Sequence, residues 1–322
     1  MKRHKICKII LAILAVFLCV AFYELIGICI TYKKQPAVSD ATIKETQNIM
    51  SVAGRENTER AVIIEKNSQA LLERVRLIQN AKDEIILSTF AFKSDESGKL
   101  ILGALHDAAD RGVHVRILVD GMESWIDMEG NPYFYGLSSH ENVEIKLYNK
   151  ANPLKPWKTM GRMHDKYLIA DGKIYILGGR NTYNYFLGDF PGHKNFDRDV
   201  LVVCDEPQKD NSVNQLWNYF ETIWEQEDCR YFHNSKKLAD RQSVKKAVLE
   251  LQEGYQQYFE VNKEKICDTD YADETFETEK ITLLSNPIHT QAKEPVVWYQ
   301  LGELMKNAKE RVKIHTPYII CN

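Results

Sequence analysis

The sequence predicts an α/β protein with a mixed sheet flanked by helices, preceded by one transmembrane helix. Three observations lead to this prediction. Between residues 60 and 260, short apolar runs that are typical of strands alternate with segments of helical apolar spacing. The turn signal Asp171-Gly172 separates two apolar runs and indicates a hairpin within the sheet. Residues 6–30 form an apolar run that is long enough to cross a bilayer.

The composition is that of an ordinary globular protein. Of the 322 residues, 44% are hydrophobic and 27% charged, so the chain can bury a sizeable core. The net charge of -3 gives no overall basic field, which argues against nucleic acid as a partner. The four cysteines outside residues 6–30 show no zinc spacing, and the sequence predicts no metal site and no cofactor.

Residues 1–34 are predicted to be an N-terminal membrane anchor. The apolar run is interrupted only by Lys8 and Glu24, and roughly 20 apolar residues suffice to span a bilayer. More basic residues precede the run than follow it, which places the N-terminus in the cytoplasm and the rest of the chain outside. A cleaved signal peptide is the alternative, although no Ala-x-Ala site follows the run. We therefore expect a single-pass protein of the cell membrane.

The remaining chain divides into four predicted parts. Residues 35–59 read as a polar tether, 60–262 as a first domain, 263–280 as a solvated acidic linker, and 281–322 as the beginning of a second domain. Apolar periodicity predicts helices over 70–78, 99–111, 214–224 and 241–260, and strands over 84–92, 113–119, 143–148, 199–204 and 281–284. Gly112 is expected to end a helix, and Asp120-Gly121 to form a turn.

The motif that points to chemistry lies around the predicted hairpin. His164, Lys166 and Asp171 have the spacing His-x-Lys-x4-Asp, and Gly178, Gly179 and Asn181 follow. Alternate residues of a strand share a face, so the imidazole and the ammonium group are expected side by side. An ammonium group binds phosphate oxygens, and an imidazole acts as nucleophile or general acid. The Gly-Gly pair permits close approach of the backbone, and the Asn181 amide offers an N–H donor.

This pattern resembles the signature of the phospholipase D superfamily. The resemblance covers roughly residues 60–320, and the anchor together with the stretch from Thr316 to Ile319 favours the cardiolipin synthase-like branch. It implies transfer or hydrolysis of a phosphodiester, such as a phosphatidylglycerol-like phospholipid, through a phosphohistidine and without a metal. In that mechanism Lys166 and Asn181 hold the non-bridging oxygens and Asp171 supports the site. Whether His164 is the nucleophile or the general acid stays open.

The same resemblance implies an acidic partner for the motif histidine. In the family an acidic residue at the position of Asp199 orients the imidazole, and Asp197, two residues earlier, is the rival candidate. A basic stretch between residues 146 and 166 leads into the motif, and we expect it to border an anionic headgroup site. Trp157 and Trp125 fit either a lipid interface or the core.

An internal echo predicts a duplicated domain. Asn307-Ala308-Lys309 repeats Asn80-Ala81-Lys82 at an offset of 227, within a longer similarity of residues 301–319 to 74–92. The resembled family builds one active site from two motifs, one per half or one per subunit of a homodimer. Only one motif occurs here, so the second is expected from a C-terminal half or from a homodimer partner, and the second domain is expected to be incomplete.

Three functions therefore compete. The favoured one is a phospholipid phosphatidyltransferase or phospholipase D. The second is an extracytoplasmic nuclease or other phosphodiesterase of the same superfamily. The third is a membrane-anchored fragment that is catalytically incomplete because it holds one motif.

Overall fold

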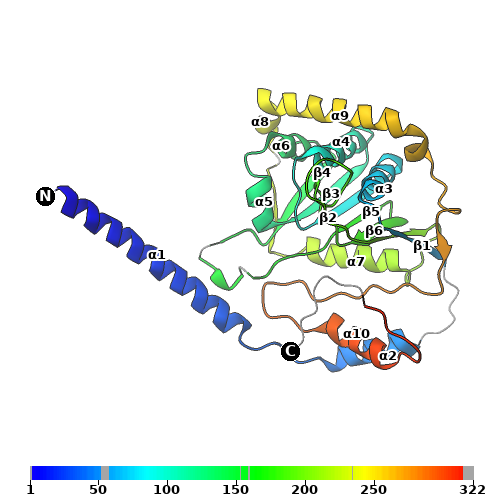
Figure 1. The fold of residues 1–322 in the computed structure, drawn as a ribbon, viewed down its shortest axis with the longest axis horizontal. Helices are drawn as coiled ribbons and strands as arrows, with labels where there is room; N and C mark the ends of the chain where they lie inside the picture. The colour runs from blue at the N-terminus through cyan, green and yellow to red at the C-terminus, as the bar shows by residue number, and fades with distance from the viewer. Residues whose placement is uncertain (1, 52–57, 153, 159, 234, 315–322) are drawn as a thin grey trace.

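The structure is a computed structural model that describes residues 2–51, 58–152, 154–158, 160–233 and 235–314. In this part of the chain the centre is a nine-stranded sheet in the order β8-β4-β3-β2-β5-β6-β7-β1-β9 (Figure 1). Its strands are β1 (Glu59–Ile64), β2 (Glu84–Thr89), β3 (His114–Asp120), β4 (Val143–Tyr148), β5 (Tyr167–Ala170), β6 (Ile174–Gly178), β7 (Asp199–Cys204), β8 (Cys229–Tyr231) and β9 (Phe276–Glu277). The helices are α1 (Lys2–Tyr32), α2 (Asp40–Ser51), α3 (Asn67–Asn80), α4 (Glu96–Asp110), α5 (Gly121–Asp127), α6 (Pro132–Ser138), the 3-10 turn η1 (Pro156–Lys158), α7 (Ser212–Trp224), α8 (Lys236–Ala239), α9 (Gln242–Cys267) and α10 (Val296–Lys306).

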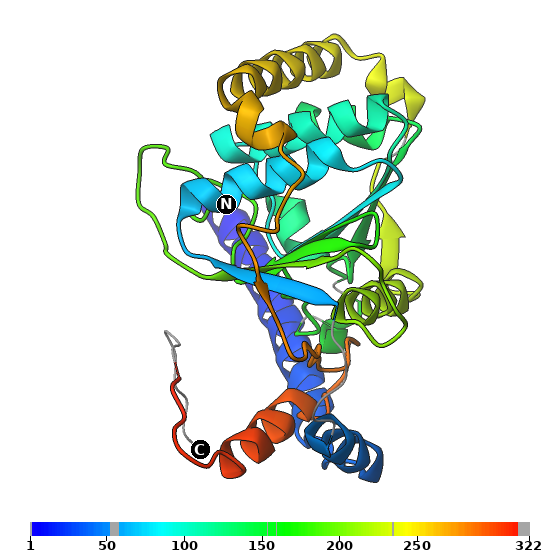
Figure 2. The ribbon, with the colours of Figure 1, turned by 90° about the vertical axis from the view of Figure 1, so that its right-hand side faces the viewer.

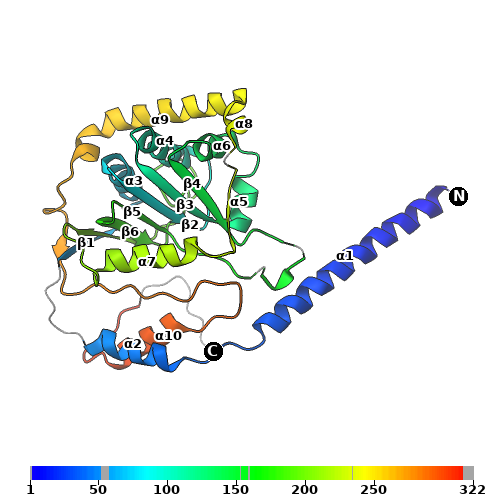
Figure 3. The same cartoon turned by 180° about the vertical axis from the view of Figure 1, so that it is seen from behind.

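The sheet is mixed, as the sequence predicts. Strands β2, β3 and β4 run parallel because helices connect them, whereas β5, β6, β7 and β1 continue the sheet in antiparallel order. Figures 1 and 3 show α3, α4, α6 and α9 on one face and α7 on the other. Each face has its own apolar cluster, represented by Leu105 and Leu251 on the first and by Phe220 and Trp224 on the second. The predicted α/β fold is confirmed.

The predicted hairpin is also confirmed, and it fixes the register of the motif. Tyr167 pairs with Leu177 on the neighbouring strand, and Asp171 and Gly172 form the turn with φ angles of 52° and 62°. Such angles are expected in the turn that joins two adjacent antiparallel strands. The prediction of a simple turn at Asp120-Gly121 is wrong, because Asp120 caps α5 there.

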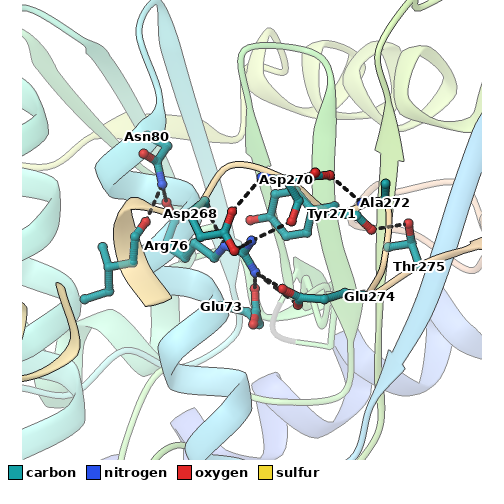
Figure 4. A network of polar contacts seen from close by, with 10 residues as sticks. Glu73, Arg76, Asn80, Asp268, Asp270, Tyr271, Ala272, Glu274 and Thr275 are labelled. Atoms are coloured by element: carbon teal, nitrogen blue, oxygen red, sulfur yellow. Dashed lines mark hydrogen bonds and ion pairs between the residues drawn. The ribbon is translucent and has the colours of Figure 1, made fainter. Parts of the chain in front are cut away.

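The acidic segment 263–280 is largely exposed, as expected, but it is fixed to the domain and includes the end of a helix. Helix α9 extends to Cys267, and the segment behind it is bound by Arg76 of α3 (Figure 4). Arg76 donates to the carbonyl oxygens of Asp268 (2.7 Å) and Asp270 (3.0 Å), pairs with Glu274 at 2.9 Å, and lies 3.9 Å from the centre of the Tyr271 ring. The acidic residues therefore surround one buried arginine and continue into edge strand β9.

Two further segments differ from the prediction. The expected tether contains α2, which packs against α10. Glu294, just before α10, accepts hydrogen bonds from Ser39 and Thr42 at the start of α2. No strand forms over residues 281–284; Leu283 instead packs beside α7, where its N–H donates to Gln215. Residues 301–306 of the internal echo belong to α10, which begins at Val296, and residues 315–319 of the echo lie outside the described residues.

Helix α1 extends away from the rest of the molecule, as Figure 1 shows, and it lies behind the sheet in the view of Figure 2. Residues His4–Tyr32 are long and apolar enough to cross a membrane, and the most apolar window of this span is not buried by the protein. An apolar helix without protein cover matches a transmembrane anchor better than a core helix.

Candidate active site

His164 and Lys166 lie in the extended segment that enters β5. The strand itself begins at Tyr167, but the Gly178 N–H already donates to the carbonyl of Lys166 (3.1 Å). Both side chains lie against the ring of Phe90, which follows β2. The His164 and Phe90 ring centres are 4.6 Å apart, and the Lys166 ammonium is 5.2 Å from the Phe90 centre. The structure thus brings the two motif residues together, as predicted.

The buried carboxylate of Asp120 binds the two residues that precede His164. Asp120, at the end of β3, caps α5, accepts the Met163 N–H (3.1 Å) and pairs with Arg162 at 2.7 Å. Arg162 also reaches Glu123 on α5. The sequence analysis missed this role of Asp120, although the carboxyl end of a parallel strand is a frequent place for functional side chains.

The surroundings make His164 and Lys166 easier to deprotonate. Burial, the Lys166 ammonium and Arg162 lower the pKa of His164 below its usual value, against a smaller opposing effect of Asp120 and Glu123. Burial lowers the pKa of Lys166 to about 8, although Asp165, Asp197 and Asp120 oppose the shift. A neutral imidazole beside a cationic ammonium group is the state that a nucleophile for an anionic substrate requires.

A cavity of about 400 Å³ opens beside these residues. His164, Lys166, Arg162 and Gly178 contribute to its wall, and residues of α7 and of the segment 283–297 line it as well. The Tyr219 hydroxyl of α7 donates to Asp165 at 2.8 Å, so this carboxylate is held beside the motif. Lys293 is a further wall residue that the sequence analysis did not single out.

The other motif residues lie at different places. Asp171 is at the far end of β5, where its carboxylate accepts the backbone N–H groups of residues 82, 83 and 84 at 2.8–3.2 Å. It therefore joins the hairpin turn to the start of β2, and the structure gives it no contact with His164. Its expected supporting role fits this position; a direct catalytic role does not.

The two glycines leave room for carboxylates. A Cβ atom at Gly178 would lie 1.9 Å from Oδ1 of Asp199, and one at Gly179 would lie 2.0 Å from Oδ2 of Asp197. Asp199 is fully buried and pairs with Arg74 (2.9 Å) and Arg180 (3.3 Å).

This arrangement revises the predicted role of Asp199. Within the described residues, the ring of His164 has no hydrogen bond to Asp199 or to its rival Asp197. Asp199 instead neutralises two buried arginines that hold α3 and the Gly-Gly segment on the sheet. Asp197 acts on Lys166 through its charge, which raises the pKa of that ammonium group.

Asn181 contacts the site indirectly, through a hydrogen bond to the backbone of Ala91, the residue after Phe90. Its side-chain oxygen accepts the Ala91 N–H at 3.2 Å, and the residue is 8% exposed. This leaves its NH₂ group without a hydrogen bond in the described part of the chain. Asn181 is not among the described residues that line the cavity, so its predicted contact with a substrate oxygen stays a prediction. In the same part of the chain, no group of three or more His, Cys, Asp or Glu side chains is arranged to hold a metal.

Comparison with known proteins agrees with this geometry. Residues 75–224 match the family model described as the PLD-like domain of cardiolipin synthase. An uncharacterized protein of Helicobacter pylori is 27% identical over 292 residues, covering 82% of this chain and 55% of its own length. Cardiolipin synthase C of Escherichia coli is 29% identical over 154 residues, covering 44% of this chain and 31% of its own length.

Among solved structures, phosphatidylserine synthase of Haemophilus influenzae is similar with a TM-score of 0.47 and 16% identity, covering 69% of this chain and 48% of that one. Residues 75–224 match a domain of the phospholipase D superfamily, and they carry the motif of that superfamily. Within that superfamily its domain is cardiolipin synthase-like. The chain spans about half the length of the Helicobacter pylori protein and about a third of the length of cardiolipin synthase C.

Proposed function

We propose that the chain carries one half of an active site that cleaves a phosphodiester bond in a phospholipid of the phosphatidylglycerol type. The observation that carries this proposal is that His164 and Lys166 both contact the ring of Phe90 and both line the same cavity. The match to the PLD-like domain of cardiolipin synthase supports a phospholipid as the substrate.

The chemistry follows from the residues at the cavity. A neutral His164 imidazole attacks phosphorus, a phosphorus–nitrogen bond forms, and the bond to the leaving alcohol breaks. Lys166 and Arg162 neutralise the non-bridging oxygens, whose negative charge grows in the transition state. Asn181 offers its free NH₂ group to the same oxygens. A second alcohol or water then attacks phosphorus and releases His164, which gives transfer or hydrolysis respectively.

The leaving alcohol needs a proton donor on the opposite side of phosphorus. We propose that a second His-x-Lys-x4-Asp motif supplies it, from further sequence of the same protein or from a second copy of the chain. We further propose that α1 anchors the protein in the cell membrane with the site on the extracytoplasmic side, because basic residues are more numerous before the apolar run than after it.

The test is turnover of labelled phosphatidylglycerol beside labelled single-stranded DNA, by protein produced from its complete natural coding sequence. We expect lipid turnover that His164→Asn abolishes and Lys166→Ala lowers by at least a hundredfold, with unchanged folding. Cleavage of DNA without lipid turnover would replace the proposal by the nuclease alternative. Lipid turnover that persists in His164→Asn would refute the assignment of the site.

A further inference from the structure

Five large apolar side chains are exposed on two segments next to the candidate site. Trp125 and Ile126 of α5 are 64% and 67% exposed, and Leu154, Trp157 and Met160 around η1 are 78%, 36% and 59% exposed. We call these five residues the apolar rim. The two segments are joined by the ion pair of Arg162 with Asp120, and large apolar side chains exposed on adjoining segments are typical of an interaction surface.

The apolar rim lies beside the helix that can span a membrane. The turn η1 packs against α1, and the Tyr23 hydroxyl of α1 is 3.5 Å from the carbonyl oxygen of Leu154. Figure 1 shows the η1 segment next to α1, with α5 on the same side of the sheet. The helix offers 29 residues, whereas a hydrocarbon core needs roughly 20. Counted from His4, roughly 20 residues end near Tyr23 and Glu24, so the outer boundary of the bilayer falls at that level of α1.

The charges around the apolar rim suit a membrane that contains anionic lipid. Lys150 and Lys155 belong to the same loop and are exposed, so their ammonium groups can remain in water while the neighbouring apolar side chains enter the bilayer. Tryptophan is favoured at such an interface because its ring is apolar and its N–H is polar.

We propose that the apolar rim inserts into the interface of the bilayer that α1 spans, and that this contact holds the cavity of His164 at the level of the lipid headgroups. The link to the cavity is direct. Arg162, at the end of the η1 loop, pairs with Asp120 at the start of α5 and also lines the cavity. The two inserted segments are thus joined at the wall of the site. The inference requires the membrane anchor but not the proposed chemistry.

The test uses the full chain in vesicles of phosphatidylcholine and phosphatidylglycerol whose acyl chains carry bromine, a contact quencher of tryptophan fluorescence. The protein has five tryptophans, and Trp298 is 74% exposed on α10, a helix that Figure 1 shows apart from α1 and η1. We expect quenching of the wild type to fall by more than half in the double variant Trp125→Phe/Trp157→Phe. The matched control Trp298→Phe should leave the quenched emission unchanged.

A second measurement separates lipid contact from contact between proteins. Leu154→Asp and Met160→Asp each replace an exposed apolar side chain of the rim by a charged one. Each should lower the quenching of Trp125 and Trp157 by bromine while the chain stays anchored through α1. Equal quenching in the rim variants and in the Trp298 control would overturn the proposal. The proposal would also be overturned if tryptophan emission changed with protein concentration but not with bromine, because the apolar rim would then contact a second copy of the chain.

Discussion

Oδ1 of Asp199 lies only 1.9 Å from the position that a Cβ atom would take at Gly178. The two residues are directly paired across β6 and β7, so the missing side chain of one makes room for the carboxylate of the other. That carboxylate in turn holds two buried arginines, Arg74 and Arg180. The glycine that the motif requires is thus explained by space and not by an unusual backbone angle.

Gly178→Ala should therefore destabilise the protein. Overpacking of a site that cannot expand costs about 1–3 kcal/mol, and here the obstacle is a carboxylate fixed by two ion pairs. Urea unfolding followed by tryptophan fluorescence measures the loss. Gly254→Ala is the matched control, because Gly254 lies within α9 with open space around it and should gain up to about 1 kcal/mol in helix propensity. Equal effects of the two substitutions would contradict the explanation.

Asp171→Ala should lower stability without removing the chemistry. Its carboxylate accepts three backbone N–H groups at the start of β2, and loss of such a cap costs about 1–2 kcal/mol. Turnover per folded molecule should stay within about threefold of the wild type, in contrast to His164→Asn. Asp171→Asn, which keeps one acceptor oxygen, should recover part of the stability. Complete loss of turnover in a folded Asp171→Ala protein would show that this residue acts in the chemistry after all.

Lys166→Met should stabilise the folded protein at pH 7 while it removes turnover. Lys166 is 5% exposed, and burial lowers the pKa of its ammonium group to about 8. One pKa unit corresponds to about 1.4 kcal/mol, so the gain should be roughly 1–3 kcal/mol.

The pH dependence gives the sign of this effect. Because the pKa of Lys166 is lower in the folded than in the unfolded state, the wild type gains stability as the pH rises from about 8 towards the unfolded value. The advantage of Lys166→Met should therefore shrink over that range, which unfolding measured at pH 7 and pH 9.5 can detect. An advantage that is constant or grows with pH would contradict the assignment of a buried, charged lysine.

The fold was largely predictable because its signals are local. The apolar runs of β4 and β7, the Asp171-Gly172 turn and the amphipathic α7 are each specified by adjacent residues. The errors concern segments whose structure depends on distant partners. Residues 268–275 are acidic and lack periodicity, and their place is fixed by Arg76 and Arg60, each about 200 residues away.

The part of the site that depends on local sequence was predictable. The part that depends on distant residues was not predicted. His164 and Lys166 are two residues apart, so the strand period placed them together. Asp120 and Phe90 meet them only through the pairing of β2 with β3 and β5, which the sequence does not display. Asp199 was expected to orient His164, and its two arginine partners were not predicted, because they come from distant segments of the chain.

Turnover should have a bell-shaped pH dependence. The acid limb reports His164, which must be neutral to attack and whose lowered pKa places that limb below the usual histidine value. The alkaline limb should lie near 8, where Lys166 loses the charge that binds the substrate. Lys166→Arg keeps a permanent charge and should remove the alkaline limb, even though its overall rate is lower. An alkaline limb near 8 that persists in Lys166→Arg would assign that limb to another group.

The most direct measurement is the capture of the covalent intermediate on His164. Protein from the complete natural coding sequence is mixed with phospholipid carrying ³²P in the phosphodiester, quenched in alkaline denaturant within one turnover, and digested for mass spectrometry. We expect label on the peptide that contains His164, and no label on any histidine in His164→Asn. Label on the partner motif's histidine alone would contradict the assignment of His164 as the nucleophile. Steady turnover of phospholipid with no label on any histidine would contradict the account.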